Sequence, residues 1–140
     1  MNNYINYDWY RNTNMNMLSF PNVDLFTPTE GYDKGNLFRN IYSQYKNYRP
    51  ITLRPKSEKE KKLFELSAVA FAAHELNLYL DLHPENQSML ALFNDYRRKS
   101  NELIKEYEEN YGPLTVSSDA LEGNTFTWEK DTWPWEGKNV

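Results

Sequence analysis

The fold of this chain is decided by the stretch SEKEKKLFELSAVAFAAHELNLYLDLHP, which runs from Ser57 to Pro84. Ser57 and Glu60 form the S-x-x-E pattern of a capping box, which starts a helix by satisfying exposed backbone N–H groups. No Gly or Pro follows until Pro84, so one uninterrupted helix of about 25 residues is expected.

A second helix follows the first almost directly. His83-Pro84 ends the first helix and restarts the chain, because Pro lacks a backbone N–H and fits the first helical turn. The second helix should then run to about Asn110, where Tyr111-Gly112-Pro113 supplies the Gly and Pro of a helix stop. Because the join is short, we predict a mainly α fold built on an antiparallel two-helix hairpin.

The two helices differ in how their apolar residues are arranged. The second is amphipathic, with one stripe made of Met89, Leu92, Phe93, Tyr96, Leu103, Ile104 and Tyr107. The first is apolar almost all the way round and keeps only a narrow polar line, which consists of Ser67, His74 and Asp81 with Asn77 beside it. One partner helix cannot bury such a circumference, and each Leu or Phe left exposed forfeits roughly 1.5–3 kcal/mol of stabilisation. We therefore expect the core to be completed by self-association or by a larger partner.

Aromatic residues dominate the regions on either side of the hairpin. Of the 140 residues, eleven are Tyr, seven are Phe and four are Trp, and together they make up 16% of the chain. We divide the chain into an Asn- and Tyr-rich N-terminal arm (1–56), the hairpin (57–112) and a Trp-rich C-terminal arm (113–140). Both arms are expected to be extended, apart from a short helix at Asn36–Tyr45. Because disordered tails are usually poor in aromatics, we expect these arms to bind something.

The C-terminal arm contains the densest aromatic cluster, FTWEKDTWPWEG at 126–137. Trp-Pro-Trp favours an extended or polyproline-like segment from which the two indoles project. The arm either folds back on its own hairpin or inserts into a partner surface, where buried Trp residues are frequent hot spots. Across the whole chain, the residues predicted to bind a partner are Phe64, Phe71, Leu78, Leu82, Phe126, Trp128, Trp133 and Trp135.

The candidates for catalysis or metal binding are weak. His74-Glu75 opens like the zinc-protease motif H-E-x-x-H, but Leu78 stands where the second His would have to be. Ser67 and His74 lie about 10 Å apart along the helix axis, which is too far for a nucleophile and its base. Three carboxylates, Glu106, Glu108 and Glu109, are read as solvated charge. We predict no catalytic, cofactor-binding or metal-binding residues.

Composition also argues against several classes of protein. With no cysteine, the chain can form no disulfide or thiolate metal site. The absence of cysteine also indicates synthesis in a reducing compartment. A net charge of -4 with interleaved signs is a poor match for nucleic acid. The apolar run from Leu63 to Leu82 is interrupted by charged and polar residues, so no membrane span is expected. No signal peptide is recognisable at the N-terminus.

Three motifs together resemble the CotJB family of spore coat proteins. The first is AFAAHELNLYLDLHPENQSMLALFNDY at 70–96, the second is KEYEENYGPL at 105–114, and the third is WPWEG at 133–137. The family pattern L-Y-L-D-x-H-P is met at 78–84, and the resemblance extends over about 58–137. A weaker similarity to the CotJA coat-associated proteins lies upstream at 25–48, although Asn40-Ile41-Tyr42 departs from the end of their core pattern.

The resemblance implies a non-enzymatic structural role in the spore coat, after synthesis in the mother-cell cytoplasm. It also implies assembly with a manganese-catalase-like coat protein, CotJC, with CotJA-like proteins and with further copies of the chain. Two alternatives remain open: a reversible adaptor or regulator of that catalase, and an enzyme with a site on the polar line of the first helix.

Overall fold

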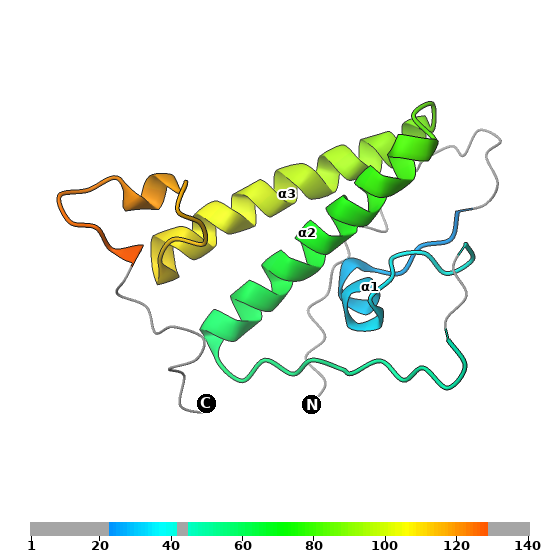
Figure 1. Cartoon of the computed structure of the whole chain (residues 1–140), viewed down its shortest axis with the longest axis horizontal. Coiled ribbons are helices and arrows are strands. Elements are labelled where there is room, and N and C mark those ends of the chain that lie inside the picture. Colours follow the sequence, from blue (N-terminus) through cyan, green and yellow to red (C-terminus); the bar gives the residue numbers. More distant parts are fainter. Residues whose placement is uncertain (1–22, 42–44, 129–140) are drawn as a thin grey trace.

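The computed structural model describes residues 23–41 and 45–128, whose regular elements are helices; they contain no β-strand beyond one isolated antiparallel bridge between Leu25 and Phe38. Their elements are helix α1 (Pro28–Lys34), helix α2 (Glu58–Leu82), helix α3 (Gln87–Tyr111) and a short 3₁₀ helix, η2 (Asp119–Leu121). Figure 1 shows α2 and α3 packed side by side, with α1 against α2. The prediction of a mainly helical chain with two long packed helices is confirmed.

Helix α2 begins where its capping box predicts. The Ser57 hydroxyl accepts a hydrogen bond from the Glu60 backbone N–H at 3.2 Å, and the Glu60 carboxylate accepts from the backbone N–H of Ser57 at 3.4 Å and of Lys56 at 2.5 Å. Donation from the Lys56 backbone, supported by that from Ser57, lowers the pKa of Glu60. The helix then runs for 25 residues to Leu82, as expected from the sequence.

Helix α3 begins three residues later than predicted. Its N-cap is Asn86, whose side-chain oxygen accepts from the Met89 backbone N–H at 3.2 Å. The Asn86 side-chain NH₂ donates to the Tyr79 hydroxyl of α2 at 3.1 Å, and Asn86 is 1% exposed. The start at Pro84 was wrong because a buried Asn that both caps α3 and bonds to α2 sets the boundary. The predicted stop is confirmed within one residue, since Tyr111 is the last helical residue and Gly112 follows with φ 104°.

The core lies between α2 and α3. The predicted stripe of α3 faces inward, with Phe93 and Ile104 half-buried at its edge. Its buried members are Met89, Leu92, Tyr96, Leu103 and Tyr107, which pack against Leu66, Val69, Ala72, Ala73, Leu76 and Tyr79 of α2. This interface covers one side of α2.

The short N-terminal helix is at Pro28–Lys34, so the helix predicted at Asn36–Tyr45 was wrong. Thr27 and Glu30 form a capping box, Pro28 occupies the first turn, and Gly35 ends the helix with φ 66°. In the predicted region the Asn36 side chain bonds to both the N–H and the C=O of Phe38, which closes a local turn in competition with a helix. Residues 42–44 lie outside the described part.

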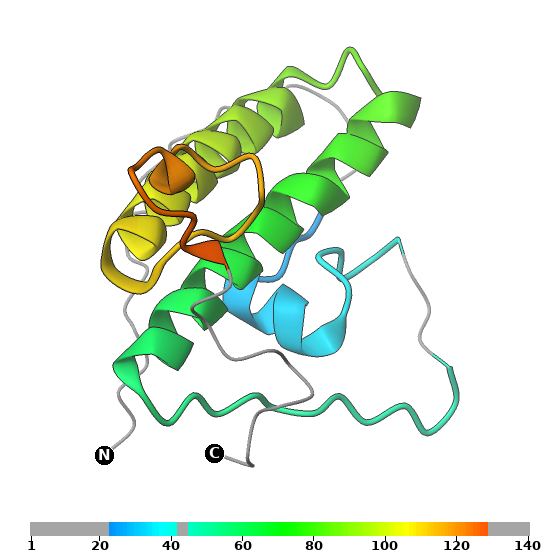
Figure 2. The ribbon, with the colours of Figure 1, turned by 60° about the vertical axis from the view of Figure 1, so that its left-hand side comes forward.

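Residues 23–41, which we call the N-terminal segment, cover a second side of α2. The Phe38 ring lies 5.5 Å from the ring of Tyr79, and the Leu37 backbone N–H donates to the Glu75 carboxylate at 3.3 Å. Leu37 is fully buried. Figure 2 shows this segment against α2 and away from α3, so α2 is held between two layers of its own chain.

Candidate interaction surface

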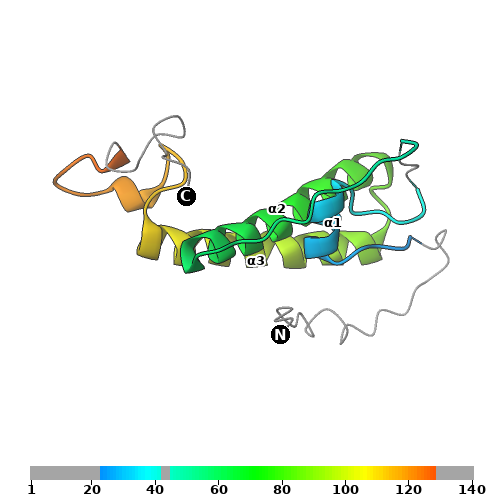
Figure 3. The ribbon, with the colours of Figure 1, turned by 90° about the horizontal axis from the view of Figure 1, so that it is seen from below.

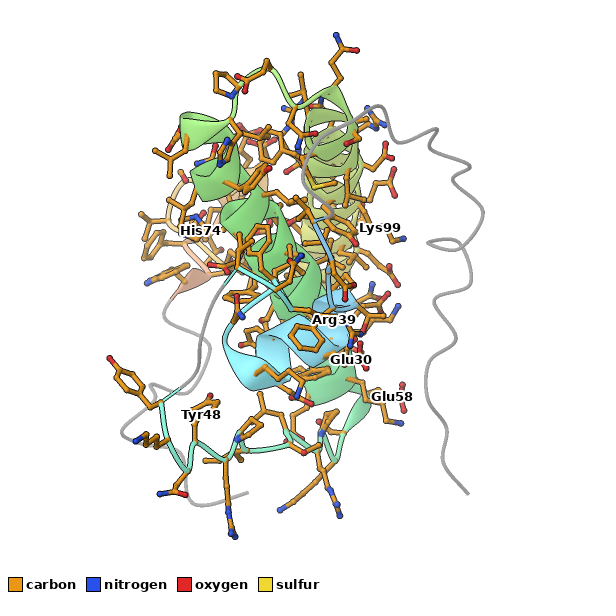
Figure 4. All side chains as sticks on the ribbon, turned by 90° about the vertical axis from the view of Figure 1, so that its right-hand side faces the viewer. Glu30, Arg39, Tyr48, Glu58, His74 and Lys99 are labelled. Atoms are coloured by element: carbon orange, nitrogen blue, oxygen red, sulfur yellow. The ribbon has the colours of Figure 1, made fainter. Side chains whose placement is uncertain are left out.

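One side of α2 is covered neither by α3 nor by the N-terminal segment. We call it the open face and define it as Leu63, His74, Asn77, Leu78, Asp81 and Leu82, all of which are exposed. Leu63 is 39% exposed, Leu78 48% and Leu82 79%. Figure 4 places His74 on the opposite side of the helix pair from Lys99. Among the residues that the structure describes, the open face thus has no covering element, and it presents leucines beside polar groups.

The predicted polar line runs along this open face. His74, Asn77 and Asp81 are exposed, and Ser67 is half-buried. The neighbour of His74, Glu75, faces another side of α2, where it accepts the hydrogen bond from Leu37. Within residues 23–41 and 45–128, no three His, Asp or Glu side chains are grouped closely enough to hold a metal ion. The two side chains of the H-E pattern therefore lie in different environments, with His74 exposed and Glu75 bonded to the N-terminal segment.

The second histidine has a packing role at the turn between the long helices. The His83 ring lies 4.5 Å from the Tyr79 ring, and its backbone N–H donates to the Tyr79 carbonyl at 3.1 Å. His83 therefore closes the end of α2 at the corner that the sequence predicts.

Two of the predicted partner-binding residues contact the N-terminal segment. The Tyr32 ring meets Phe64 and Phe71 edge-on, at centroid distances of 5.7 and 5.8 Å. Both phenylalanines are half-buried, whereas Leu78 and Leu82 lie on the open face. The structure thus separates the four predicted residues of α2 into two shielded and two available side chains, and their part in partner binding stays a prediction.

The described part of the C-terminal arm folds over the end of α3. Trp128 is half-buried and lines a cavity of about 320 Å³ together with Glu108, Tyr111 and Pro113. Phe126 remains 60% exposed. Figure 3 shows residues 113–128 at the end of the helix pair that lies away from the turn at 83–86. Trp133 and Trp135 lie outside the described residues.

Two of the glutamates read as solvated charge have structural partners. Lys62 of α2 donates to the Glu106 carboxylate of α3 at 2.5 Å, and this hydrogen bond lowers the pKa of Glu106 and raises the pKa of Lys62. Glu108 accepts from the Leu114 backbone N–H at 2.8 Å. Of the three, only Glu109 fits the prediction of a solvated carboxylate. The partner of Glu106 could not be predicted, because the sequence does not show which basic residue of the neighbouring helix lies opposite it.

Sequence reasoning also missed a set of exposed apolar residues between the N-terminal segment and α2. Tyr45 is 83% exposed, Ile51 79% and Leu53 47%. The sequence feature that could have predicted their exposure is the pair Pro50 and Pro55, which keeps this stretch out of a helix and therefore out of the core. No helix in the described ranges has the length and apolarity that a membrane crossing needs.

Comparison with known proteins identifies one match. The family model described as "CotJB protein" matches residues 60–136. This range is more than half of the 140 residues and includes nearly all of α2, the whole of α3 and most of the C-terminal arm. No curated protein and no solved structure matches the chain. Residues 25–48 lie upstream of the matched range, and their similarity to CotJA stays a prediction.

Proposed function

The chain belongs to the CotJB family of spore coat proteins, and from this premise we propose that it is a non-enzymatic scaffold of the coat. In this role it assembles with further copies of itself and with a manganese-catalase-like coat protein. We further propose that it is made in the mother-cell cytoplasm and that CotJA-like proteins join the same assembly.

The observation that carries the proposal is the open face of α2. Leu78 and Leu82 keep much of their surface in water on a helix whose other sides are covered. Burial of apolar surface contributes roughly 25 cal/mol per Å², so these side chains favour contact with another protein. Contiguous exposed apolar residues bordered by polar groups are typical of protein–protein interfaces. Here His74, Asn77 and Asp81 supply the polar border.

The displaced pKa values support a structural role over a catalytic one. Strongly perturbed titratable groups in a cleft would suggest an active site. In this chain the pKa of Glu60 is lowered by a helix cap, and those of Lys62 and Glu106 are displaced by their mutual ion pair. Each shift is explained by an interaction that holds helices in place. Any peroxide chemistry of the assembly would then belong to the catalase-like partner.

Capture of the catalase-like coat protein by the tagged chain tests this proposal. We expect Leu78→Ser/Leu82→Ser to reduce capture by about tenfold or more, because two apolar contacts of the open face are lost. Leu90→Ser is the matched control, since Leu90 is 41% exposed but belongs to α3. Equal capture by the wild-type chain and the double variant would show that the open face is not the docking surface.

A further inference from the structure

A basic extended segment separates the N-terminal segment from α2. Residues 46–56, KNYRPITLRPK, contain four basic residues and no acidic one, in a chain of net charge -4. Lys46, Arg49, Arg54 and Lys56 are all exposed. Within the described residues, the side chains of Lys46, Arg49 and Arg54 form no salt bridge, whereas the charge of Lys56 acts on Glu60 at the start of α2. We call residues 46–56 the basic segment.

The basic segment begins with a turn at Lys46 and Asn47, where φ of Asn47 is 65°, and contains no helix or strand from Tyr48 to Lys56. Pro50 follows Arg49 and Pro55 follows Arg54, and each Pro restricts the backbone. The Tyr48 hydroxyl donates to the Lys34 carbonyl at 3.1 Å, and the Leu53 backbone N–H donates to Asp33 at 3.3 Å. Because two prolines and two hydrogen bonds already restrict residues 48–56, this part of the segment loses less conformational entropy when it binds.

A groove with an acidic lining lies along the C-terminal half of α3. Its volume is about 840 Å³, and it lies between the C-terminal half of α3 and residues 114–120. Ile104 and Leu114 supply apolar lining, and both are half-buried. The charged residues of the lining are Lys105, Glu108, Glu109 and Asp119, which give three acidic groups against one basic group.

The basic segment and the acidic groove are opposite in charge, and both contain apolar side chains. Ile51 and Leu53 lie between the two Arg-Pro pairs, as Ile104 and Leu114 lie among the carboxylates. Arg49 and Arg54 are about 16 Å apart at the rise of a polyproline helix. Along α3, the groove residues Asn101 and Glu109 are about 12 Å apart. The two surfaces can therefore bring opposite charges together while apolar side chains meet.

We propose that the basic segment of one copy docks in the acidic groove of a second copy. Within one copy the two surfaces stay apart, as both Figure 1 and Figure 2 show for the extended stretch before α2 and residues 113–128. The terminal stretches are poorer matches for the groove: residues 1–22 carry one Asp and one Arg, and residues 129–140 carry three acidic and two basic residues. This inference rests on the self-assembly in the proposed function and names its contact.

The proposed contact is heterologous, because one copy contributes the basic segment and the other contributes the acidic groove. Such contacts build rings if the rotation closes and open chains of copies if it does not. Because the groove and the basic segment are separate surfaces of each copy, one copy can make both contacts at once, which allows growth beyond a dimer.

Charge reversal of each surface tests the contact in the full chain. The segment variant is Arg49→Glu/Arg54→Glu, and the groove variant is Glu109→Lys/Asp119→Lys; all four residues are exposed. We expect each variant alone to self-associate roughly tenfold more weakly in sedimentation velocity, because like charges then face each other. An equimolar mixture should recover association, since each reversed surface meets its complement on the other variant. Circular dichroism establishes that each variant is folded.

A matched control separates this contact from a general effect of net charge. Arg97→Glu/Arg98→Glu changes the net charge as much as the segment variant does, at exposed positions of α3 outside both surfaces. We expect it to associate like the wild-type chain. If the wild-type chain assembles and the reversed variants do so equally well, or the mixture fails to recover, the contact is wrong while self-assembly stands. A wild-type chain that remains monomeric would overturn both.

Discussion

The ring of Phe38 lies 5.5 Å from the ring of Tyr79, whose hydroxyl accepts a hydrogen bond from the side chain of Asn86. Tyr79 therefore joins the N-terminal segment, α2 and the cap of α3 at one point. The N-terminal segment is thus part of the fold and completes a core that α2 and α3 leave open.

Removal of the Phe38 ring should destabilise the whole chain. Phe38 is 7% exposed, and truncation of a buried Phe to Ala typically costs about 3–5 kcal/mol. We expect Phe38→Ala to lower the free energy of unfolding by about that amount in urea titration. Phe126→Ala, at a position that is 60% exposed, should change it by no more than about 0.5 kcal/mol. Similar small effects of both variants would mean that the N-terminal segment does not complete the core.

The Asn86 side chain should stabilise the fold through both its oxygen and its NH₂ group. Asn86→Ala removes the N-cap of α3 and the bond to Tyr79, and cap loss alone costs about 0.5–2 kcal/mol. Asn86→Asp keeps the capping oxygen and removes the donor, so its melting temperature should lie between those of the wild type and Asn86→Ala. Asn77→Ala, on the open face, is the control. If Asn86→Asp were as damaging as Asn86→Ala, the cap would not be the main contribution.

Substitution of Gly112 should destabilise the fold because of the backbone conformation at this position alone. A Cβ added at Gly112 meets nothing within 4 Å, but φ is 104°, which L side chains rarely adopt. We expect Gly112→Ala to cost about 1–3 kcal/mol through strain. Gly123→Ala, where there is equal space and φ is not positive, should be close to neutral in the same thermal unfolding experiment. Equal stability of the two variants would show that the positive φ at Gly112 does not strain an alanine there.

The ion pair between Lys62 and Glu106 should make a small, pH-dependent contribution to stability. The pKa of Glu106 is lowered from 4.5 in the folded state, so its contribution is present above that pH and is lost as the pH falls through the folded pKa. The pKa of Lys62 is raised from 10.5, so its contribution disappears only in more alkaline solution.

We therefore expect Glu106→Gln to melt slightly below the wild type at neutral pH, with a gap that closes as the pH falls below 4.5 and through the lowered pKa of Glu106. Glu109→Gln, an exposed neighbour on the same helix, should show no such gap. A gap for Glu106→Gln that persists in acid would assign the effect to packing and not to the ion pair.

The long helices could be predicted from sequence because local signals determine them. The Ser57 and Glu60 cap, the uninterrupted run to Leu82 and the Gly112 stop each act within a few residues. The start of α3 was misplaced because Asn86 is fixed by a bond to Tyr79 of the other helix, which is a tertiary effect.

The N-terminal segment shows the opposite case. The T-P-T-E pattern at 27–30 is a complete helix-start signal, whereas the prediction of a helix at 36–45 rested on apolar spacing alone. The N-terminal segment covers α2 through Tyr32, Leu37 and Phe38, and these contacts join residues more than thirty positions apart in the sequence. Sequence reasoning therefore found that α2 needed extra cover, but not which part of the chain supplies it.

The most direct test of the account is whether the open face of α2 becomes buried in the complex with the catalase-like coat protein. The chain has no cysteine, so Leu78→Cys and Leu90→Cys each carry a single environment-sensitive fluorophore. We predict that complex formation shifts the emission of the label at position 78 to shorter wavelength and leaves the label at position 90 unchanged. A complex that forms with no change at position 78 would contradict the account.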